Sequence, residues 1–368
     1  MKKTIGVLAH VDAGKTTFSD QVLYHTKSIK TRGRVDHKNS FLDSHDIEKK
    51  RGITVFSDQA VFDINDSTYY LIDTPGHIDF SCEMERAIRI MDYAIVIVSA
   101  VEGVQGHTET VWNLLRKYKV PTFFFINKLD RTGADLKRVL QEINNNLSKD
   151  VCFITDLEEM NEEFIAEKDE LLLEKYLNDE YENNLWVNKL RDLIRENKIY
   201  PCFSGSALQD EGIREFLNVL EELTSTNYDS SCEFSGIVNK IRYDSNGTRI
   251  TFIKALSGKL KVRDEIEISK ADTNIKEKIS SIRIYNGNKF ITVDEVEAGD
   301  VFAVTGLSTV NAGDGIGILN NKVNFNMIPT LMSSVIYDES YNEKEVLKYF
   351  KILEAEDPAL NVLWNETH

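Results

Sequence analysis

The sequence has few cysteines and no long apolar run, and each absence excludes a class of protein. The four cysteines are widely spaced, form no CxxC pair and have no nearby histidine that would complete a zinc set. We therefore expect reduced, structural thiols. The N-terminal apolar stretch is interrupted by His10 and Asp12, and no run of roughly eighteen apolar residues occurs, so neither a signal peptide nor a membrane span is predicted. We expect a cytoplasmic protein without membrane contacts.

Positively charged residues are outnumbered, because 44 Lys and Arg stand against 60 Asp and Glu and give a formal net charge of −16 at pH 7. Spread evenly, this charge would argue against nucleic-acid binding, but it is concentrated in one segment. Residues 156–182 carry twelve Asp or Glu against two Lys, whereas the stretches KSIKTRGRVDHK and EKKRG are locally basic. Runs of this kind most often form solvated faces. The net charge therefore does not decide the class of partner.

Strand and helix patterns alternate over the first part of the chain. Apolar, β-rich runs occur at TIGVLA, AVFDI, TYYLID, AIVIVSA, PTFFFIN and YPCFSGS, and helical patterns such as GKTTFSDQVLYHT and GHTETVWNLLRKY lie between most of them. Strands this uniformly apolar suit a sheet that is buried on both faces. The pattern predicts an α/β domain with a mostly parallel sheet and helices on both faces.

Changes in the pattern of strand-like and helix-like segments along the chain predict the domain organisation. We expect the α/β domain to cover residues 1–226, with an acidic helical insertion at about 151–198. Short alternating strands after the linker-like TSTNYDSSCEF predict a small β-barrel over residues 231–326. Residues 327–368 show a strand, a helix near NEKEVLKYFKIL and a second strand, ALNVLW. This tail is expected to be the start of an incomplete, truncated α+β third domain.

A phosphate-binding loop is predicted where the first strand meets the first helix. The stretch AHVDAGKTT fits the pattern GxxxxGK[ST], with Ala9 at the first position. Backbone N–H groups of such a turn surround a β-phosphate. Lys15 would lie against the β- and γ-phosphates, and the Thr16 hydroxyl would ligate Mg²⁺. The residues expected to bind the nucleotide here are His10, Val11, Asp12, Ala13, Gly14, Lys15, Thr16 and Thr17.

Two further motifs suit a γ-phosphate and its metal ion. DTPGH follows the strand YYLI, where the carboxylate of Asp73 can hold Mg²⁺ through water and Gly76 can offer its N–H to a γ-phosphate. RGIT lies in a polar segment between AHVDAGKTT and DTPGH, and its Thr54 could add a contact to Mg²⁺. Alone, DTPG is more often a plain turn and RGIT is uninformative.

Two later motifs suit guanine. NKLD ends the strand TFFFI, and the carboxylate of Asp130 can accept hydrogen bonds from N1–H and the 2-amino group of guanine, a donor pair that adenine lacks. SGSA ends the last strand, where a backbone N–H can meet the 6-oxygen. The ordered set of motifs predicts a switch that binds GTP or GDP with Mg²⁺. The residues expected on the base side are Asn127, Lys128, Asp130, Ser206, Ala207 and Leu208.

Taken together, these motifs resemble those of the translational GTPases. The stretches GVQGHTETVW, ITFIKALSGKLKVRDEI and LEAEDPAL extend the likeness over the whole chain. More narrowly, the chain resembles the elongation factor G group with its tetracycline-resistance ribosomal protection proteins of the Tet(M)/Tet(O) type. GHTETVW and NKLDRTGAD look like elongation factor G, whereas AHVDAGKTT and PTFFFINK look like the protection proteins.

The resemblance implies a mechanism and a partner. His77, the residue after DTPG, would orient the attacking water on the ribosome, and Val11 and Ile53 would gate its access. With Lys15, Thr54 and Gly76 it would form the catalytic set. No arginine finger in the chain itself is evident, since Arg51 could equally be a surface residue, so intrinsic hydrolysis should be slow.

The function predicted from the sequence is that of a ribosome-stimulated GTPase, acting as a monomer in tetracycline resistance by ribosomal protection. Two alternatives stay open: an elongation factor G-like translocation factor, and a non-ribosomal GTP-dependent switch that recruits a protein through the barrel.

Overall fold

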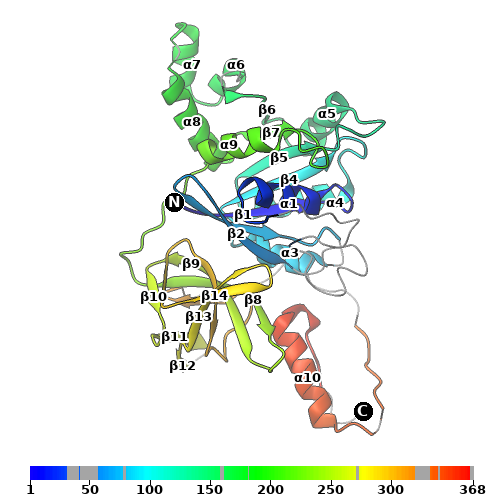
Figure 1. Cartoon of the computed structure of the whole chain (residues 1–368), viewed down its shortest axis with the longest axis vertical. Coiled ribbons are helices and arrows are strands. Elements are labelled where there is room, and N and C mark those ends of the chain that lie inside the picture. Colours follow the sequence, from blue (N-terminus) through cyan, green and yellow to red (C-terminus); the bar gives the residue numbers. More distant parts are fainter. Residues whose placement is uncertain are drawn as a thin grey trace. The chain divides into compact units, whose positions relative to one another are not determined.

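The computed structural model describes most of the chain and divides it into two compact units. The first comprises residues 1–80, 91–227 and 286–288, and the second comprises residues 81–90, 228–285 and 289–368. Figure 1 shows the elements of each unit. The residues that the structure describes are 1–30, 41, 57–77, 80–157, 161–180, 182–270, 273–319, 332–338 and 340–364.

A seven-stranded sheet forms the centre of the first unit. Its strands are β1 (Lys2–Ala9), β2 (Asp58–Ile64), β3 (Ser67–Asp73), β4 (Tyr93–Ser99), β5 (Thr122–Asn127), β6 (Val151–Phe153) and β7 (Tyr200–Ser204). They lie in the order β2-β3-β1-β4-β5-β7-β6. Every neighbouring pair is parallel except β2 and β3, which pair antiparallel. The predicted mostly parallel α/β sheet is confirmed.

Helices cover both faces of this sheet. The helices of the first unit are α1 (Lys15–His25), α4 (Gly106–Lys117), α5 (Leu136–Asn146), α6 (Glu162–Ala166), α7 (Glu170–Leu177), α8 (Asn183–Arg195) and α9 (Ile213–Leu223). Consecutive residues of a strand point to opposite faces. The ring of Phe124 lies 5.4 Å from that of Trp112 on α4, whereas Phe125 lies 5.6 Å from Phe216 on α9. Helices α4 and α9 therefore pack on opposite faces.

The strand β6 was not expected, because the sequence pattern placed residues 151–198 in a helical insertion. Val151–Phe153 is three residues long, which is too short for a periodic signal, and it joins the sheet by pairing with β7. The expected acidic helical sequence follows it as α6, α7 and α8.

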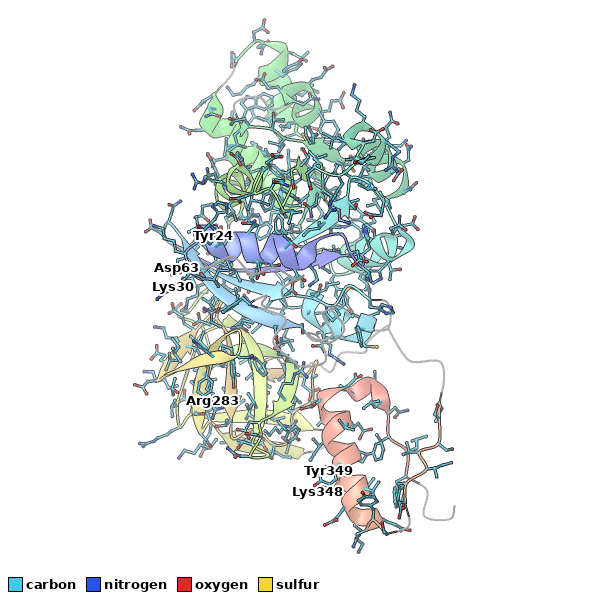
Figure 2. All side chains as sticks on the ribbon, turned by 45° about the vertical axis from the view of Figure 1, so that its right-hand side comes forward. Tyr24, Lys30, Asp63, Arg283, Lys348 and Tyr349 are labelled. Atoms are coloured by element: carbon cyan, nitrogen blue, oxygen red, sulfur yellow. The ribbon has the colours of Figure 1, made fainter. Side chains whose placement is uncertain are left out.

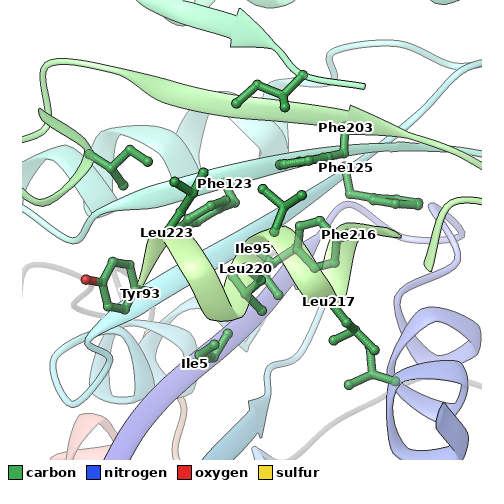
Figure 3. Packing of buried hydrophobic residues seen from close by; sticks show 14 of the residues in the cluster. Ile5, Tyr93, Ile95, Phe123, Phe125, Phe203, Phe216, Leu217, Leu220 and Leu223 are labelled. Carbon is green, nitrogen blue, oxygen red and sulfur yellow. The ribbon is translucent and has the colours of Figure 1, made fainter. Parts of the chain in front are cut away.

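Phe216 occupies the centre of the core on the α9 face (Figure 3). Its ring is fully buried and lies 5.6 Å from Phe18, 6.4 Å from Phe123 and 5.1 Å from Phe203, measured between ring centroids. Most of these contacts are edge-on, the arrangement that aromatic quadrupoles favour. Phe216 therefore joins α1, α9 and two strands.

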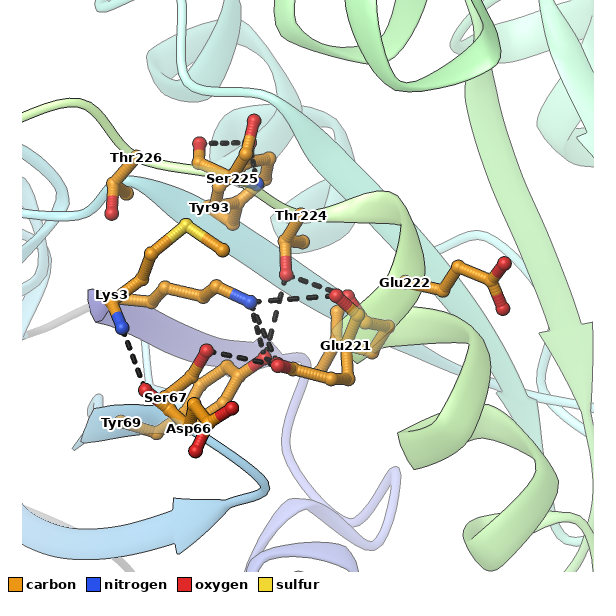
Figure 4. Close-up of polar contacts among 12 residues, drawn as sticks. Lys3, Asp66, Ser67, Tyr69, Tyr93, Glu221, Glu222, Thr224, Ser225 and Thr226 are labelled. Carbon is orange, nitrogen blue, oxygen red and sulfur yellow. Dashed lines mark hydrogen bonds and ion pairs between the residues drawn. The ribbon is translucent and has the colours of Figure 1, made fainter. Parts of the chain in front are cut away.

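A buried ionic network ties the start of β1 to α9 (Figure 4). The Lys3 ammonium donates to Glu221 Oε2 at 2.7 Å and to the Tyr69 hydroxyl at 2.9 Å, and Ser67 donates to Glu221 Oε1 at 2.9 Å. Burial lowers the pKa of Lys3, whereas the carboxylate of Glu221 raises it. The network leaves the buried ammonium paired, which is the condition for its toleration in a core.

All four cysteines are free, as expected. Cys152 lies in β6 and Cys202 in β7, and both side chains are buried. Burial raises the pKa of the Cys152 thiol to about 11, because the thiolate would be poorly solvated. This thiol is therefore protonated at neutral pH and unreactive.

The second unit contains the strands predicted for the small β-barrel, and they pair antiparallel. The expected ones are β8 (Ser235–Tyr243), β9 (Arg249–Ser257), β11 (Glu265–Lys270), β13 (Ser281–Asn286) and β16 (Val301–Thr305). Further strands in this unit are β10 (Lys259–Lys261), β12 (Thr273–Lys278), β14 (Lys289–Val293), β15 (Glu295–Glu297) and β17 (Gly315–Gly317). Six of them form a sheet in the order β14-β13-β16-β9-β8-β17, and β10-β15 and β11-β12 form two further pairs. The helix α3 (Ser81–Ile88) groups with this unit.

The C-terminal region has the predicted helix but neither predicted strand among its described residues. Helix α10 spans Glu343–Glu356, and the Asn342 side chain caps it by accepting a 2.9 Å bond from the Lys344 N–H. Residues 332–338 form no strand, and Pro358–Leu360 forms a 3₁₀ turn where ALNVLW was predicted to be extended. A strand needs a neighbouring strand whose backbone pairs with its own N–H and C=O groups. Tyr349 on α10 is 66% exposed (Figure 2).

We expect Phe216→Ala to lower the free energy of unfolding by about 3–5 kcal/mol, because it removes a buried ring and leaves a cavity among four others. Urea denaturation measures the change. Leu177→Ala is the matched control, since Leu177 on α7 is 73% exposed and its truncation should cost less than about 0.5 kcal/mol. A loss below about 1 kcal/mol for Phe216→Ala would show that the cluster is not the centre of the core.

Candidate functional site

Four of the predicted motifs, AHVDAGKTT, DTPGH, NKLD and SGSA, lie at the carboxyl ends of strands in the first unit. β1 ends at Ala9, β3 at Asp73, β5 at Asn127 and β7 at Ser204. In a parallel sheet these ends meet at one edge, which is where open α/β folds bind their ligands. The sheet order places β1 between β3 and β4, so the loop after β1 lies in the middle of that edge.

The loop between β1 and α1 leads into a helix whose N-cap residue has no side chain to cap the first backbone N–H groups. Gly14 is the N-cap of α1 in a left-handed conformation, with φ 93°, and makes no side-chain cap hydrogen bond. The loop is closed by a 3.3 Å bond from the Ala13 N–H to the His10 carbonyl. A Cβ on Gly14 would come within 2.4 Å of Asn127 Nδ2, so only glycine fits. An uncapped helix start of this kind suits an anion.

Lys15 and Asp73 lie together in the buried part of the site. The Lys15 ammonium donates to Asp73 Oδ2, and the Ser19 hydroxyl lies 3.3 Å from Asp73 Oδ1. The Asp73 side chain is fully buried, and that of Lys15 is 7% exposed. The adjacent Thr74 hydroxyl fixes the chain after β3 by donating to the Val7 carbonyl at 2.8 Å. The structure thus brings two of the predicted phosphate and metal residues into contact.

Thr16 and Thr17 follow Lys15 in the first turn of α1, and both are half-buried. Val11 and Asp12 are exposed, and Asp12 has a φ of 63°. Thr54, together with Arg51 and Ile53, lies outside the described residues. Among the residues with described positions, no group of three or more His, Cys, Asp or Glu side chains could hold a metal ion unaided. The Asp73 carboxylate and the Thr16 hydroxyl are nevertheless hard oxygen ligands of the kind that Mg²⁺ prefers when a phosphate completes its shell.

Gly76 and His77 lie beside the β1–α1 loop. A Cβ on Gly76 would come within 3.2 Å of the Ala9 carbonyl, so the two segments approach closely. His77 is half-buried, its carbonyl accepts a 3.1 Å bond from the Phe80 N–H, and its ring lies 6.1 Å from that of Phe80. The predicted catalytic histidine is therefore at the edge of the predicted phosphate loop.

Two further histidines lie nearby, and one of them, His107, was not singled out by its sequence pattern. His107 lies in the first turn of α4, and His10 lies in the β1–α1 loop. Both ring nitrogens of each are buried and have no hydrogen-bond partner among the described residues. Burial lowers the pKa of both rings, and the neighbouring His77 lowers that of His107 further. Both rings are therefore uncharged at pH 7.

Asn127 joins the predicted phosphate side of the site to the predicted base side. Its Nδ2 donates to the Ala13 carbonyl at 2.9 Å, and its Oδ1 accepts from the Ala207 N–H at 2.9 Å. The side chain is buried, so neither bond competes with water. One amide therefore fixes the β1–α1 loop relative to the loop after β7.

The remaining base-side residues also meet. The Ser206 hydroxyl donates to Asp130 Oδ1 at 2.6 Å, and the Leu129 N–H donates to the Gly205 carbonyl at 3.2 Å. Lys128, with a φ of 69°, points its ammonium toward Glu102 at 3.3 Å. Leu208 is 41% exposed. NKLD and SGSA thus form one continuous surface at the ends of β5 and β7.

Comparison with known proteins decides the family. Residues 2–226 match the model of the elongation factor Tu GTP binding domain, and residues 233–317 match the model of elongation factor G domain 2. The chain belongs to the translational GTPase family. In this translational GTPase, the described residues include no helix with the length and apolarity needed to cross a membrane.

Curated relatives of this translational GTPase include tetracycline resistance proteins. It is 34% identical to tetracycline resistance protein TetP of Clostridium perfringens, over 100% of the chain and 60% of that protein. It is 30% identical to TetO of Streptococcus pneumoniae, over 97% of the chain and 58% of that protein. The chain thus spans about 60% of the length of these relatives. A solved structure from Thermus thermophilus shares its fold, with a TM-score of 0.82, 22% identity, and coverage of 98% of this chain and 61% of that one.

We expect Asn127→Asp to lower the free energy of unfolding of this translational GTPase by about 2–3 kcal/mol at pH 7 without nucleotide. The substitution keeps the shape but sets a charged oxygen against the Ala13 carbonyl. Chemical denaturation measures it. The same change at Asn184, which is exposed in the first turn of α8, is the control and should be nearly neutral. Equal effects at both positions would contradict the bridging role.

Proposed function

We propose that this chain binds GTP with Mg²⁺ and hydrolyses it when the full-length protein is on the ribosome. The observation that carries the proposal is the Asn127 bridge between the Ala13 carbonyl and the Ala207 N–H. Through it, the helix start at Gly14 and the hydrogen-bonding groups of NKLD and SGSA share one edge of the sheet. The family match over residues 2–226 supports the same assignment.

On the phosphate side, Lys15 faces the β- and γ-phosphates and the backbone of residues 10–17 surrounds them. Thr16, Asp73 and Thr54 hold Mg²⁺, which supplies charge neutralisation at the transferred phosphoryl group. The contact between the Lys15 ammonium and the buried carboxylate of Asp73 supports the proposal that both groups belong to one site.

On the base side, the carboxylate of Asp130 accepts from N1–H and the 2-amino group of guanine. Ser206 holds that carboxylate in place through its 2.6 Å hydrogen bond. Within the segment Ser206–Leu208, the Leu208 N–H reads the 6-oxygen, because the N–H groups of Ser206 and Ala207 donate to the Glu211 carbonyl and to Asn127. Asn127 and Lys128 line the remaining edge of the base.

His77 and Gly76 act at the reacting end. Gly76 offers its N–H to the γ-phosphate, and His77 orients the attacking water when the ribosome is bound, with Val11 and Ile53 limiting access. Phosphoryl transfer needs a positioned water more than a strong base, so a half-buried histidine beside the phosphate loop suits this role.

We further propose that the full-length protein protects the ribosome against tetracycline, as a cytoplasmic monomer. The identity of 34% to TetP supports this, although the compared region covers 60% of that protein. The match of residues 233–317 to elongation factor G domain 2 favours a second candidate, a translocation factor. The same matches support domains over residues 1–226 and 231–326.

Two measurements on the full-length protein separate the candidates. Co-sedimentation with 70S ribosomes in the presence of a non-hydrolysable GTP analogue should succeed for both ribosomal functions and fail for a switch that binds another protein. Cells that express the protein should tolerate more tetracycline if it protects ribosomes. Unchanged tetracycline susceptibility with ribosome binding retained would favour translocation.

We expect His77→Ala to keep GTP affinity within a few-fold but to lower ribosome-stimulated hydrolysis by about 10²-fold or more. The residue acts on water and not on the nucleotide, so binding and turnover separate. Single-turnover hydrolysis on ribosomes measures the rate, and nucleotide titration is the control. Unchanged turnover would remove His77 from the mechanism.

We expect Asp130→Asn to exchange the base preference from guanine to xanthine. The amide sets a donor opposite the 2-amino group of guanine, whereas it matches the 2-oxygen and N1–H of xanthine. Each reversed hydrogen bond is worth about 1–3 kcal/mol in a desolvated pocket. Competition of GDP against XDP at fixed Mg²⁺ measures the base preference of the wild type and of the variant. A variant that still prefers GDP, or a wild type that binds ADP as well as GDP, would contradict the assignment.

A further inference from the structure

Helix α1 contacts the loop after β7 through two of its own side chains, and neither of them belongs to a predicted motif. Gln21 Nε2 donates to the Ala207 carbonyl at 2.8 Å. One helical turn later, His25 Nε2 lies 2.6 Å from Asp210 Oδ1. Residues four apart lie on the same face of a helix, so α1 presents both groups to this loop. The helix that begins at Lys15 therefore also reaches the base side of the site.

The loop itself is a tight turn with little freedom of its own. Ser206 and Glu211 exchange two backbone hydrogen bonds, of 3.1 and 2.9 Å. A Cβ on Gly205 would come within 2.2 Å of the Glu211 carbonyl, so the two ends of the turn are closely packed. Because the turn is closed internally, its contacts with other elements decide where it points.

The bond from Gln21 sets the orientation of one peptide group. In a trans peptide the C=O and the following N–H lie in one plane and point in opposite directions, and no cis peptide occurs among the described residues. The Ala207 carbonyl points at Gln21, so the Leu208 N–H points away from α1. The Ala207 N–H is fixed separately, by Asn127. Both peptides that flank Ala207 are thus held.

The Gln21 bond is formed out of contact with water. Gln21 is 5% exposed, and its Oε1 is buried without a hydrogen-bond partner within the described part of the chain. A buried donor lost from such a site leaves the Ala207 carbonyl unsatisfied. The loop would then reorient until the Ala207 carbonyl found another donor. The direction of the Leu208 N–H would change with it.

We propose that Gln21 is a specificity-determining positioning residue, which holds the Ala207–Leu208 peptide so that its N–H reads the 6-oxygen of guanine, while His25 anchors the far end of the same turn through Asp210. The inference rests on the guanine-binding function proposed above. Gln21 does not touch the base. It acts through one peptide plane and therefore affects recognition of one atom of the base.

The test compares three nucleotides on the wild type and on Gln21→Met, which keeps the length of the side chain but has no donor. Relative to GDP, 6-thio-GDP changes only the 6-oxygen, and IDP lacks only the 2-amino group that Asp130 reads. In Gln21→Met, we expect the preference for GDP over 6-thio-GDP to fall about three- to ten-fold. The preference for GDP over IDP should stay within about two-fold, because Asp130 and Ser206 are untouched.

Gln21→Leu provides a second variant without a donor, in case the flexible methionine repacks. Tyr24→Phe, at the half-buried Tyr24 on the same helix (Figure 2), is the control and should change neither ratio. Thermal melting confirms that each variant is folded. Isothermal titration at fixed Mg²⁺ provides the affinities.

Three outcomes would overturn the inference. Unchanged ratios in both variants would show that Gln21 has no role in base recognition. A parallel fall of both ratios would show a general loosening of the base site. Variants that fail to fold would show a structural role. If the wild type itself binds ADP as well as GDP, the proposed function fails instead, and the two failures are thereby distinguished.

Discussion

The candidate site depends on one buried amide. Asn127 can satisfy both of its hydrogen bonds only when the Ala13 carbonyl and the Ala207 N–H are held at a fixed separation, and both bonds measure 2.9 Å. Its side chain is buried, so a lost bond is not replaced by water. The close approach of Asn127 Nδ2 to Gly14 also explains why the loop needs a glycine there. Geometry on the phosphate side and the base side is therefore coupled through a single residue.

The sheet makes this coupling possible. Parallel strands bring their carboxyl ends to one edge, and the order β3-β1-β4-β5-β7 places the loops after β1, β3, β5 and β7 around it. The same order sets Asp73 at the end of β3 beside β1, with Val7 as its partner in the register, so that the Lys15 ammonium reaches it. A charged pair this deeply buried is tolerated because each partner neutralises the other.

Much of this arrangement could be predicted from the sequence, because it depends on patterns of neighbouring residues. Apolar runs followed by glycine, lysine or aspartate motifs indicate strand ends, and their alternation with helical patterns indicates a mostly parallel sheet. Sequence patterns predict less where an element is only a few residues long, or where a residue's contacts come from distant parts of the chain. Val151–Phe153 is too short to show a period, and ALNVLW has strand-like composition but forms a 3₁₀ turn at Pro358–Leu360. His107 and Gln21 belong to ordinary helical patterns, and their surroundings come from residues far away in the chain.

Helix α1 shows how core packing can determine a specificity contact. Phe18 packs against Phe125 and Phe216 at 4.9 and 5.6 Å, which fixes the rotation of the helix about its axis. With that rotation fixed, the spacing of three to four residues per turn places Lys15 at one end of the site, and Gln21 about 9 Å further along the helix. A helix rigidly attached to the core therefore sets the distance between Lys15, the proposed phosphate contact, and the turn proposed to read the base. Changes to the core beneath Phe18 would move both ends together, whereas changes at Gln21 affect only the turn.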